Sequence, residues 1–189
     1  MLPNPLLFLY LRRHRLSLAL LELMDLAGII GIINAKFGED FVSIDEEISA
    51  DTIRLTPEQW GQLAPFLRET PELFFDAMMC ITGIDEGIES ENLAVVYNLH
   101  SMKHNHKLEI YVSTTKKDPK VPSVEKIWRI ADWFEREVYD MYGIEFVGHR
   151  DLRRILLPSD WEGFPLRKDY EFPETWHGIV VDKMKEGWE

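Results

Sequence analysis

Residues 93–112 read LAVVYNLHSMKHNHKLEIYV, and their pattern decides the fold. Apolar side chains recur at every second position on both sides of a short polar segment, which is the period of a half-buried β-strand. The polar segment, Lys103-His104-Asn105, has the composition of a turn. We therefore predict a β-hairpin. The apolar residues that alternate along it are Leu93, Val95, Tyr97, Leu99, Leu108, Ile110 and Val112.

Helices are predicted on both sides of this hairpin. Thr56-Pro57-Glu58-Gln59 is a strong helix start, because Thr caps, Pro suits the first helical position and Gln completes a capping box. This helix is expected to reach Leu67, with Pro65 bending or breaking it. Ser123 is expected to cap a second helix, which Gly143 ends. Its apolar residues recur at spacings of three and four and are Val124, Ile127, Ala131, Phe134, Val138 and Met141.

Shorter segments complete the predicted domain. Residues 41–44 and 52–55 are expected to be short strands joined by the acidic turn 45–47. Residues 74–84 are uniformly apolar, which predicts a helix that runs into a buried strand. The expected fold class is α+β, a small mixed or antiparallel sheet with helices packed on one face, followed by an extended C-terminal arm.

Three regions follow from this pattern. We predict an N-terminal helical extension over residues 1–34, the α+β domain over residues 35–146, and an extended partner-binding tail over residues 147–189. Within the extension, residues 16–33 are expected to form an amphipathic helix that packs on the domain or on a partner. Acidic residues interrupt this apolar run, which argues against a membrane span. A mitochondrial presequence stays open, because residues 1–21 carry three arginines and no acid.

Composition excludes several classes of function. A formal net charge of −12 argues against binding to nucleic acid or to an anionic membrane surface. Cys80 is the single cysteine, so the chain lacks the thiolates of an iron–sulfur cluster and can form no disulfide within itself. Because Cys80 lies in an apolar run, we predict that it is buried in the core.

Residues 135–171 combine charge with large apolar side chains. They include 15 charged residues, interleaved with Trp, Tyr, Phe and Leu. A disordered segment would lack the apolar residues, and a core would not hold so many charges. We interpret this stretch as a protein interface, with Trp161, Phe164 and Trp176 as anchors in pockets of a partner.

Other clusters of polar residues have simpler explanations than a site. His100, His104 and His106 form a possible metal cluster, but their place at a predicted turn favours surface histidines. The carboxylates of Glu135, Glu137 and Asp140 suggest ion pairs within the helix, with Arg136 between them. Basic pairs such as Arg153-Arg154 and Arg167-Lys168 lack the glycine-rich loop of a phosphate site.

The chain resembles a known family in its charged stretch. The resemblance covers residues 35–171 and is nearly unbroken over residues 135–171. The family is the 30 kDa subunit, also called the C subunit, of NADH:quinone oxidoreductase, or respiratory complex I. The motif positions are Glu135-Arg136-Glu137, Asp140-Met141-Tyr142-Gly143-Ile144, His149, Asp151-Leu152-Arg153-Arg154-Ile155-Leu156, Asp160-Trp161-Glu162-Gly163 and Pro165-Leu166-Arg167-Lys168-Asp169-Tyr170.

The resemblance implies a non-catalytic subunit in the peripheral arm of a proton-pumping enzyme. It implies no cofactor in this chain, while NADH, FMN, iron–sulfur clusters and quinone belong to the complex. The implied partners are the large quinone-site subunit and the adjacent iron–sulfur subunit, and the motif residues would serve assembly. The implied location is the cytoplasmic face of the bacterial inner membrane, in preference to the mitochondrial matrix side, with membrane contact only through the complex.

Besides a generic scaffold protein outside bioenergetics, two alternatives remain at this point. One is the equivalent subunit of a ferredoxin-dependent or hydrogenase-type membrane complex. The other is a stand-alone metal-dependent hydrolase that uses Glu135, Glu137, Asp140 and His149, which requires these side chains to converge on one ion.

Overall fold

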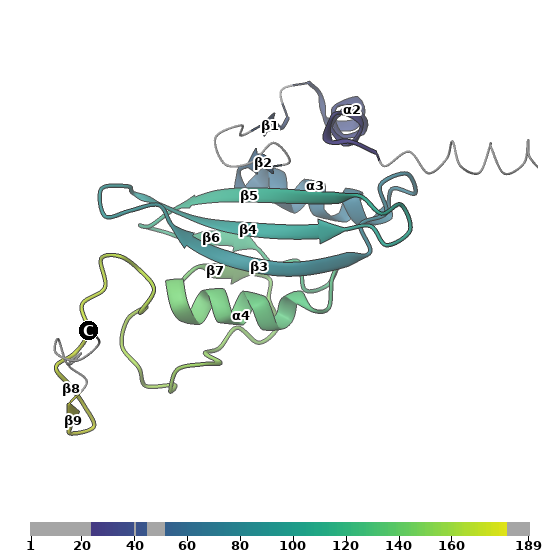
Figure 1. The fold of residues 1–189 in the computed structure, drawn as a ribbon. Coiled ribbons are helices and arrows are strands. Elements are labelled where there is room, and N and C mark those ends of the chain that lie inside the picture. The colour runs from purple at the N-terminus through teal and green to yellow at the C-terminus, as the bar shows by residue number, and fades with distance from the viewer. Residues whose placement is uncertain (1–23, 40, 45–51, 181–189) are drawn as a thin grey trace, which may run out of the picture.

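A computed structural model describes residues 24–39, 41–44 and 52–180 of the chain. Five strands form one sheet in the order β1-β2-β5-β4-β3, in which β2 and β5 run parallel and all other neighbours run antiparallel. Two further strand pairs, β6-β7 and β8-β9, lie outside this sheet (Figure 1). The elements are α2 (Leu26–Phe37), β1 (Ser43–Ile44), β2 (Thr52–Leu55), α3 (Pro57–Glu69), β3 (Ala77–Asp85), β4 (Asn92–His100), β5 (Lys107–Thr115), β6 (Lys120–Pro122), α4 (Ala131–Tyr142), β7 (Glu145–Val147), β8 (Thr175–Trp176) and β9 (Ile179–Val180).

The predicted hairpin is confirmed as β4 and β5 at the centre of the sheet. All seven alternating apolar residues are at most 1% exposed, because they share the face that the helices cover. The ring of Tyr97 lies 4.4 Å from that of Trp60 in α3. Gly83 in β3 is on the same face and lies against Val138 and Tyr142 of α4. Both helices therefore pack on one face of the sheet, and the predicted α+β class is confirmed (Figure 1).

Helix α3 forms as its sequence predicts but does not break at Pro65. Thr56 and Gln59 form the reciprocal hydrogen bonds of the capping box. The helix continues to Glu69, because its buried stripe holds it against the sheet on both sides of the proline. The buried residues of this stripe are Trp60, Leu63, Ala64 and Leu67.

The start predicted for the second helix is wrong. Helix α4 begins at Ala131, and residues 123–130 form turns. Ser123 does not cap a helix, because its hydroxyl donates to the carboxylate of Glu135 at 2.6 Å. The predicted end is confirmed at Gly143, whose φ of 72° is the left-handed conformation that glycine favours.

Two predictions for strand β3 also need correction. The helix expected before it does not form: Phe74 has a φ of 38°, and the strand runs from Ala77 to Asp85. Cys80 is only half-buried, although a core position was predicted. It pairs with Asn98, so it faces away from the helices on a strand at the edge of the sheet.

The N-terminal segment joins the core of the domain. Helix α2 is capped by the Asp25 carboxylate, which accepts from the amide of Gly28 at 2.9 Å. Ile29 and Ile33 are buried in the main core, and the helix continues past residue 34, the predicted boundary. The possible presequence at 1–21, residues 16–23 of the predicted amphipathic helix and the turn at 45–47 lie outside the described residues. Of the helices in the described part of the chain, none has the length and apolar character to cross a bilayer.

Candidate functional site: the anchored arm

Residues 149–168 run back along helix α4 and are bonded to it and to the sheet. Buried carboxylates of the domain accept hydrogen bonds from the main chain and arginines of this segment, which we call the arm. We expected residues from Gly148 onward to lack a partner within the chain. That expectation is wrong for residues 149–168, because the Arg154 side chain and several main-chain amides of this segment find their partners in α4 and β3.

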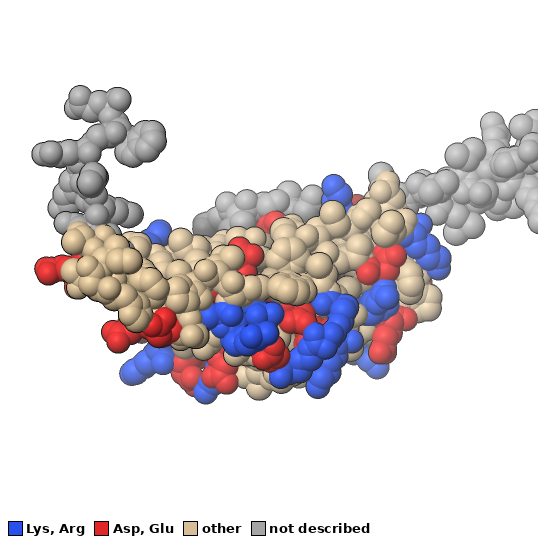
Figure 2. Space-filling model, turned by 90° about the horizontal axis from the view of Figure 1, so that it is seen from below, with Lys and Arg blue, Asp and Glu red and all other residues tan. Residues whose placement is uncertain are grey.

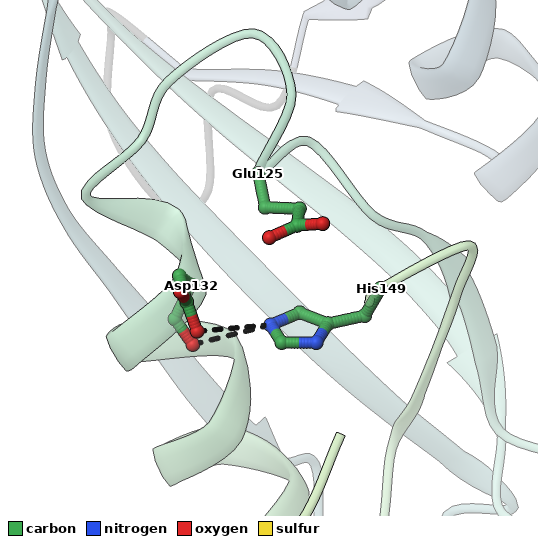
Figure 3. Close-up of side chains that lie close together, drawn as sticks. All are labelled: Glu125, Asp132 and His149. Atoms are coloured by element: carbon green, nitrogen blue, oxygen red, sulfur yellow. Dashed lines mark hydrogen bonds and ion pairs between the residues drawn. The ribbon is translucent and has the colours of Figure 1, made fainter. Parts of the chain in front are cut away.

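The arm begins at a cluster of Glu125, Asp132 and His149 (Figure 3). The His149 side chain is fully buried, and its Nε2 lies 3.3 Å from the Asp132 carbonyl oxygen and 3.5 Å from the Asp132 carboxylate. Arg150 pairs with the Asp132 carboxylate, and its Nε lies 3.3 Å from Glu125. Burial would raise the pKa of Asp132, but the hydrogen bond and charge of Arg150 lower it. The start of the arm is thus held by paired charges.

The cluster fits an ion-paired anchor better than a metal site. Its three ligand atoms lie within 4.8 Å of one another. However, His149 Nδ1 accepts from the main-chain amide of Asp151 at 3.0 Å, so the neutral ring carries its proton on Nε2. That proton points toward the carboxylates, where a metal ion would need a free lone pair. The guanidinium of Arg150 already supplies positive charge to both carboxylates.

Glu135 lies beside this cluster and is completely buried. It accepts from the Ser123 hydroxyl at 2.6 Å and from the Val124 amide at 2.7 Å, and it lies 3.9 Å from His149 Nε2. Burial raises the pKa of Glu135 to about 7, although the two hydrogen bonds oppose the rise. Its carboxyl group therefore fixes the loop before α4 and changes its charge near neutral pH.

Asp140 holds the middle of the arm. Its Oδ2 accepts from three successive main-chain amides, those of Ile155, Leu156 and Leu157, at 3.0, 2.7 and 2.9 Å. Its Oδ1 accepts from Arg154 Nη1 at 2.7 Å. Burial alone would raise the pKa of Asp140, but these donors bring it below the usual range. The arm is thus wrapped around one buried carboxylate.

Asp85, at the end of β3, holds the last part of the arm. Its carboxylate accepts from the Lys168 amide at 2.9 Å and pairs with Lys116 Nζ at 2.8 Å. Nearby, Arg167 Nε donates to the carbonyl of Tyr142 at 2.6 Å. The ring of Phe164 packs on Gly143, where an added Cβ would lie 2.4 Å from it. Phe164 was predicted to anchor in a partner, but this packing is within the chain.

The remaining motif residues lie on helix α4 and in the arm. Arg136 does not pair with a carboxylate of its own helix: its Nε donates to the carbonyl of Arg153 at 3.3 Å. Glu137 is exposed, so the four residues of the hydrolase alternative do not converge, and that alternative is wrong. The exposed motif residues of the arm are Asp151, Arg153, Asp160, Lys168 and Asp169, whereas Trp161, Pro165 and Arg167 are half-buried.

The histidines of the hairpin turn serve its packing. His106 is only 3% exposed, which corrects the expectation of a surface residue, and its Nε2 lies 2.7 Å from the carbonyl of Leu73. His104 Nε2 lies 2.8 Å from the carbonyl of Pro71. Both rings thus tie the turn to the segment before β3 and do not form a metal cluster.

Sequence reasoning did not identify three of the residues that anchor the arm, Glu125, Asp85 and Arg150. Glu125 has a local partner, Arg129, at 3.6 Å, but the contacts with which these three residues hold the arm join residues 18 to 83 positions apart, so no local spacing indicates them. A buried acid at a strand end, as in the Gly-Ile-Asp of residues 83–85, is the one signal that could have indicated Asp85.

Comparisons with known proteins identify the family of this chain. The chain matches the family described as the 30 kDa subunit of respiratory-chain NADH dehydrogenase over residues 53–175. It belongs to this family. The match includes the whole arm and all of its anchors.

Bacterial relatives are named as the C subunit of NADH-quinone oxidoreductase. The protein of Chloroherpeton thalassium is 47% identical over 152 residues, which cover 79% of this chain and 62% of the relative. That of Chlorobium phaeobacteroides is 43% identical over 79% of this chain and 91% of its own length. The chain therefore spans less than two thirds of the first relative and most of the second. Neither relative is named as a subunit of a ferredoxin-dependent or hydrogenase-type complex.

Solved structures share the fold. A trypsin-resistant fragment of Nqo5 is 27% identical with a TM-score of 0.50, over 59% of this chain and 88% of the fragment. A chain of an archaeal membrane-bound sulfane sulfur reductase has a TM-score of 0.64 at 20% identity, over 84% of this chain and 94% of its own length. The second likeness concerns the fold alone.

Proposed function

We propose that this chain is a structural subunit in the peripheral arm of a proton-pumping NADH-quinone oxidoreductase and serves its assembly. The observation that carries the proposal is the separation of polar and apolar groups in the anchored arm. The Arg154 side chain and main-chain amides of the arm bind inward to buried carboxylates, while large apolar side chains of the arm and of α4 remain outside. Trp133, Leu156 and Leu166 are 59%, 62% and 52% exposed. We call these three residues the outer arm surface.

The outer arm surface has the chemistry of a protein interface. Trp133 lies two helical turns before Asp140 on α4, and Leu156 is fixed over Asp140 by its own amide. The guanidinium of Arg136 lies 5.3 Å from the centre of the Trp133 ring. Tryptophan and arginine supply a large share of binding energy in known interfaces. Figure 2 shows the α4 side of the molecule, where acidic and basic groups lie next to one another around uncharged surface.

The proposed partners are the large quinone-site subunit and the adjacent iron–sulfur subunit. NADH, FMN, the clusters and quinone would be bound elsewhere in the complex. The single cysteine supports this, because a cluster held by thiolates needs about four of them. The proposed location is the cytoplasmic face of the bacterial inner membrane, and the bacterial sources of the relatives support it.

The motif residues have a proposed role in shaping this interface. Asp140, Arg154 and Arg167 would position the arm from within, so that the outer arm surface meets its partner in one conformation. The tail predicted over residues 147–189 is proposed to bind a neighbouring subunit.

The experiment replaces chromosomal copies of the gene with charged variants. The double variant Trp133→Glu with Leu156→Glu should lose co-purification with the other subunits and NADH:quinone activity in membranes. The isolated variant should unfold at the same urea concentration as the original chain, because both side chains are mostly exposed. Met102→Glu is the matched control, since Met102 is 71% exposed at the hairpin turn, away from the arm.

Unchanged co-purification of the double variant would contradict the proposal. A loss that Met102→Glu shares equally would also contradict it, because the effect would then be independent of the outer arm surface.

A further inference from the structure

A cleft of about 330 Å³ lies beyond the anchored part of the arm. One side is formed by Asp160, Trp161 and Glu162, and the other by the hairpin of β8 and β9, with Thr175, Trp176 and His177. The two indole rings are 5.7 Å apart and tilted by 47°. Because the rings contact each other, a ligand would lie across them and not between them.

Local bonds hold the two walls of this cleft in place. Trp161 Nε1 donates to the Tyr170 hydroxyl at 3.1 Å, and that hydroxyl donates to the Glu162 carbonyl at 3.0 Å. His177 and Gly178 have φ values of 49° and 77°, as a two-residue hairpin turn of type I′ requires. His177 Nε2 lies 2.6 Å from Asp160, which connects the hairpin to the opposite wall. The aromatic wall is therefore built before any ligand arrives.

The charges of the cleft select a cation. Residues 159–177 contain five acidic and two basic residues, and Asp160 and Glu162 both line the cleft. An anion or a purely apolar segment would meet unfavourable charge here. A metal ion does not fit, because in the described part of the chain only Glu125, Asp132 and His149 bring three ligand atoms within 4.8 Å of one another. The remaining candidate is an organic cation.

We infer that this cleft binds an arginine side chain of a neighbouring subunit. A guanidinium stacks flat on an indole ring and at the same time donates to carboxylates in its plane, which an ammonium group does not do. Trp161 and Trp176 supply the rings, and Asp160 and Glu162 supply the carboxylates. The inference rests on the proposed function only in requiring a neighbouring subunit. It identifies a second contact, separate from the outer arm surface.

The test places the photoreactive residue p-benzoylphenylalanine at position 175, which lines the cleft without supplying a ring or a carboxylate, and irradiates the purified complex. We expect a cross-link to another subunit, at a segment whose arginine lies next to the cross-linked residue in the peptide identified by mass spectrometry. A cross-link to a segment without arginine, a cross-link only within this chain, or no cross-link would overturn the inference.

A second measurement tests whether the cleft residues themselves contribute to binding. The complex is purified without this subunit, and its affinity for the full chain is measured for three variants of the chain. Trp176→Ala and Glu162→Gln should each lower the affinity about tenfold or more, as removal of a central aromatic or ionic contact does. Ile179→Ala, which changes an exposed residue of the same hairpin outside the cleft, should change it less than about twofold.

Equal affinities for all three variants would overturn the inference while leaving assembly intact. Failure of the original chain to bind the complex at all would instead contradict the proposed function, so the two failures are distinguishable.

Discussion

Replacing Asp140 with asparagine tests the anchoring of the arm most directly. The substitution keeps the size of the side chain but removes its charge and turns one oxygen into a donor. In the native protein both oxygens only accept, one from Arg154 and the other from three main-chain amides. Whichever way the asparagine amide turns, its NH₂ group faces a donor.

The expected magnitude follows from burial. Asp140 is 0% exposed and the Arg154 side chain is 14% exposed, so neither group can recover its bonds from water. Breaking a buried ion pair costs about 3–5 kcal/mol, and asparagine recovers part of this through its remaining oxygen. We therefore expect a loss of roughly 2–4 kcal/mol in the free energy of unfolding.

Urea denaturation of the full chain measures the loss, and hydrogen exchange locates it. The amides of residues 155–157 should exchange about a hundredfold faster in the variant, while those of β4 should change only with global stability. Asp118→Asn is the matched control, because Asp118 forms its ion pair with Lys120 at the surface with a side chain 71% exposed. Its expected effect is below about 0.5 kcal/mol. Equal stability and equal exchange at residues 155–157 in the two variants would refute the anchoring argument.

Three further predictions concern the same region. Arg154→Ala should lower the free energy of unfolding in urea by roughly 2–4 kcal/mol, because it leaves a buried carboxylate unpaired. The control Arg153→Ala removes an exposed side chain and should lower it by less than about 0.5 kcal/mol. Similar losses in the two variants would contradict the inward pairing of Arg154. Burial raises the pKa of Glu135 from 4.5 to about 7, so the stabilisation by its proton, roughly 3 kcal/mol, is full below pH 4.5 and is lost as the pH rises to about 7. Glu135→Gln should flatten this part of the stability profile between pH 4.5 and 8, and an unchanged slope would count against it. Gly143→Ala should lower the melting temperature more than Gly178→Ala does. The two glycines have similar φ values, 72° and 77°, but an added Cβ meets a ring, that of Phe164, only at Gly143. Equal decreases in melting temperature would show that the Phe164 ring moves aside.

The sequence predicted the hairpin, the capped start of α3 and the end of α4, because these depend on local patterns. Alternation around Tyr97, the capping box at Thr56 and the glycine at 143 each act within a few residues. The start of α4 was missed because the Ser123 hydroxyl bonds to a carboxylate twelve residues away. Its preference for a helix cap was overridden by tertiary structure.

The sequence predicted which residues make up the candidate site, but not whether they bind within the chain or to another subunit. The charged motif indicated an interface, yet Arg154 and Phe164 proved to bind within the chain. Nothing in a charge pattern shows whether a partner residue lies in the same chain or in another. The decisive contacts, such as that between Asp85 and residue 168, join positions 83 residues apart.

The anchoring of residues 149–168 has a consequence for the thermodynamics of assembly. Holding one residue of a free chain in a single backbone conformation costs about 1–2 kcal/mol of conformational entropy. For a segment of 20 residues that cost would fall on the binding step if the segment were ordered only by its partner. Here the buried carboxylates order the arm during folding of the subunit. A neighbour that meets it loses little further chain entropy, so even a modest contact area can give a stable complex.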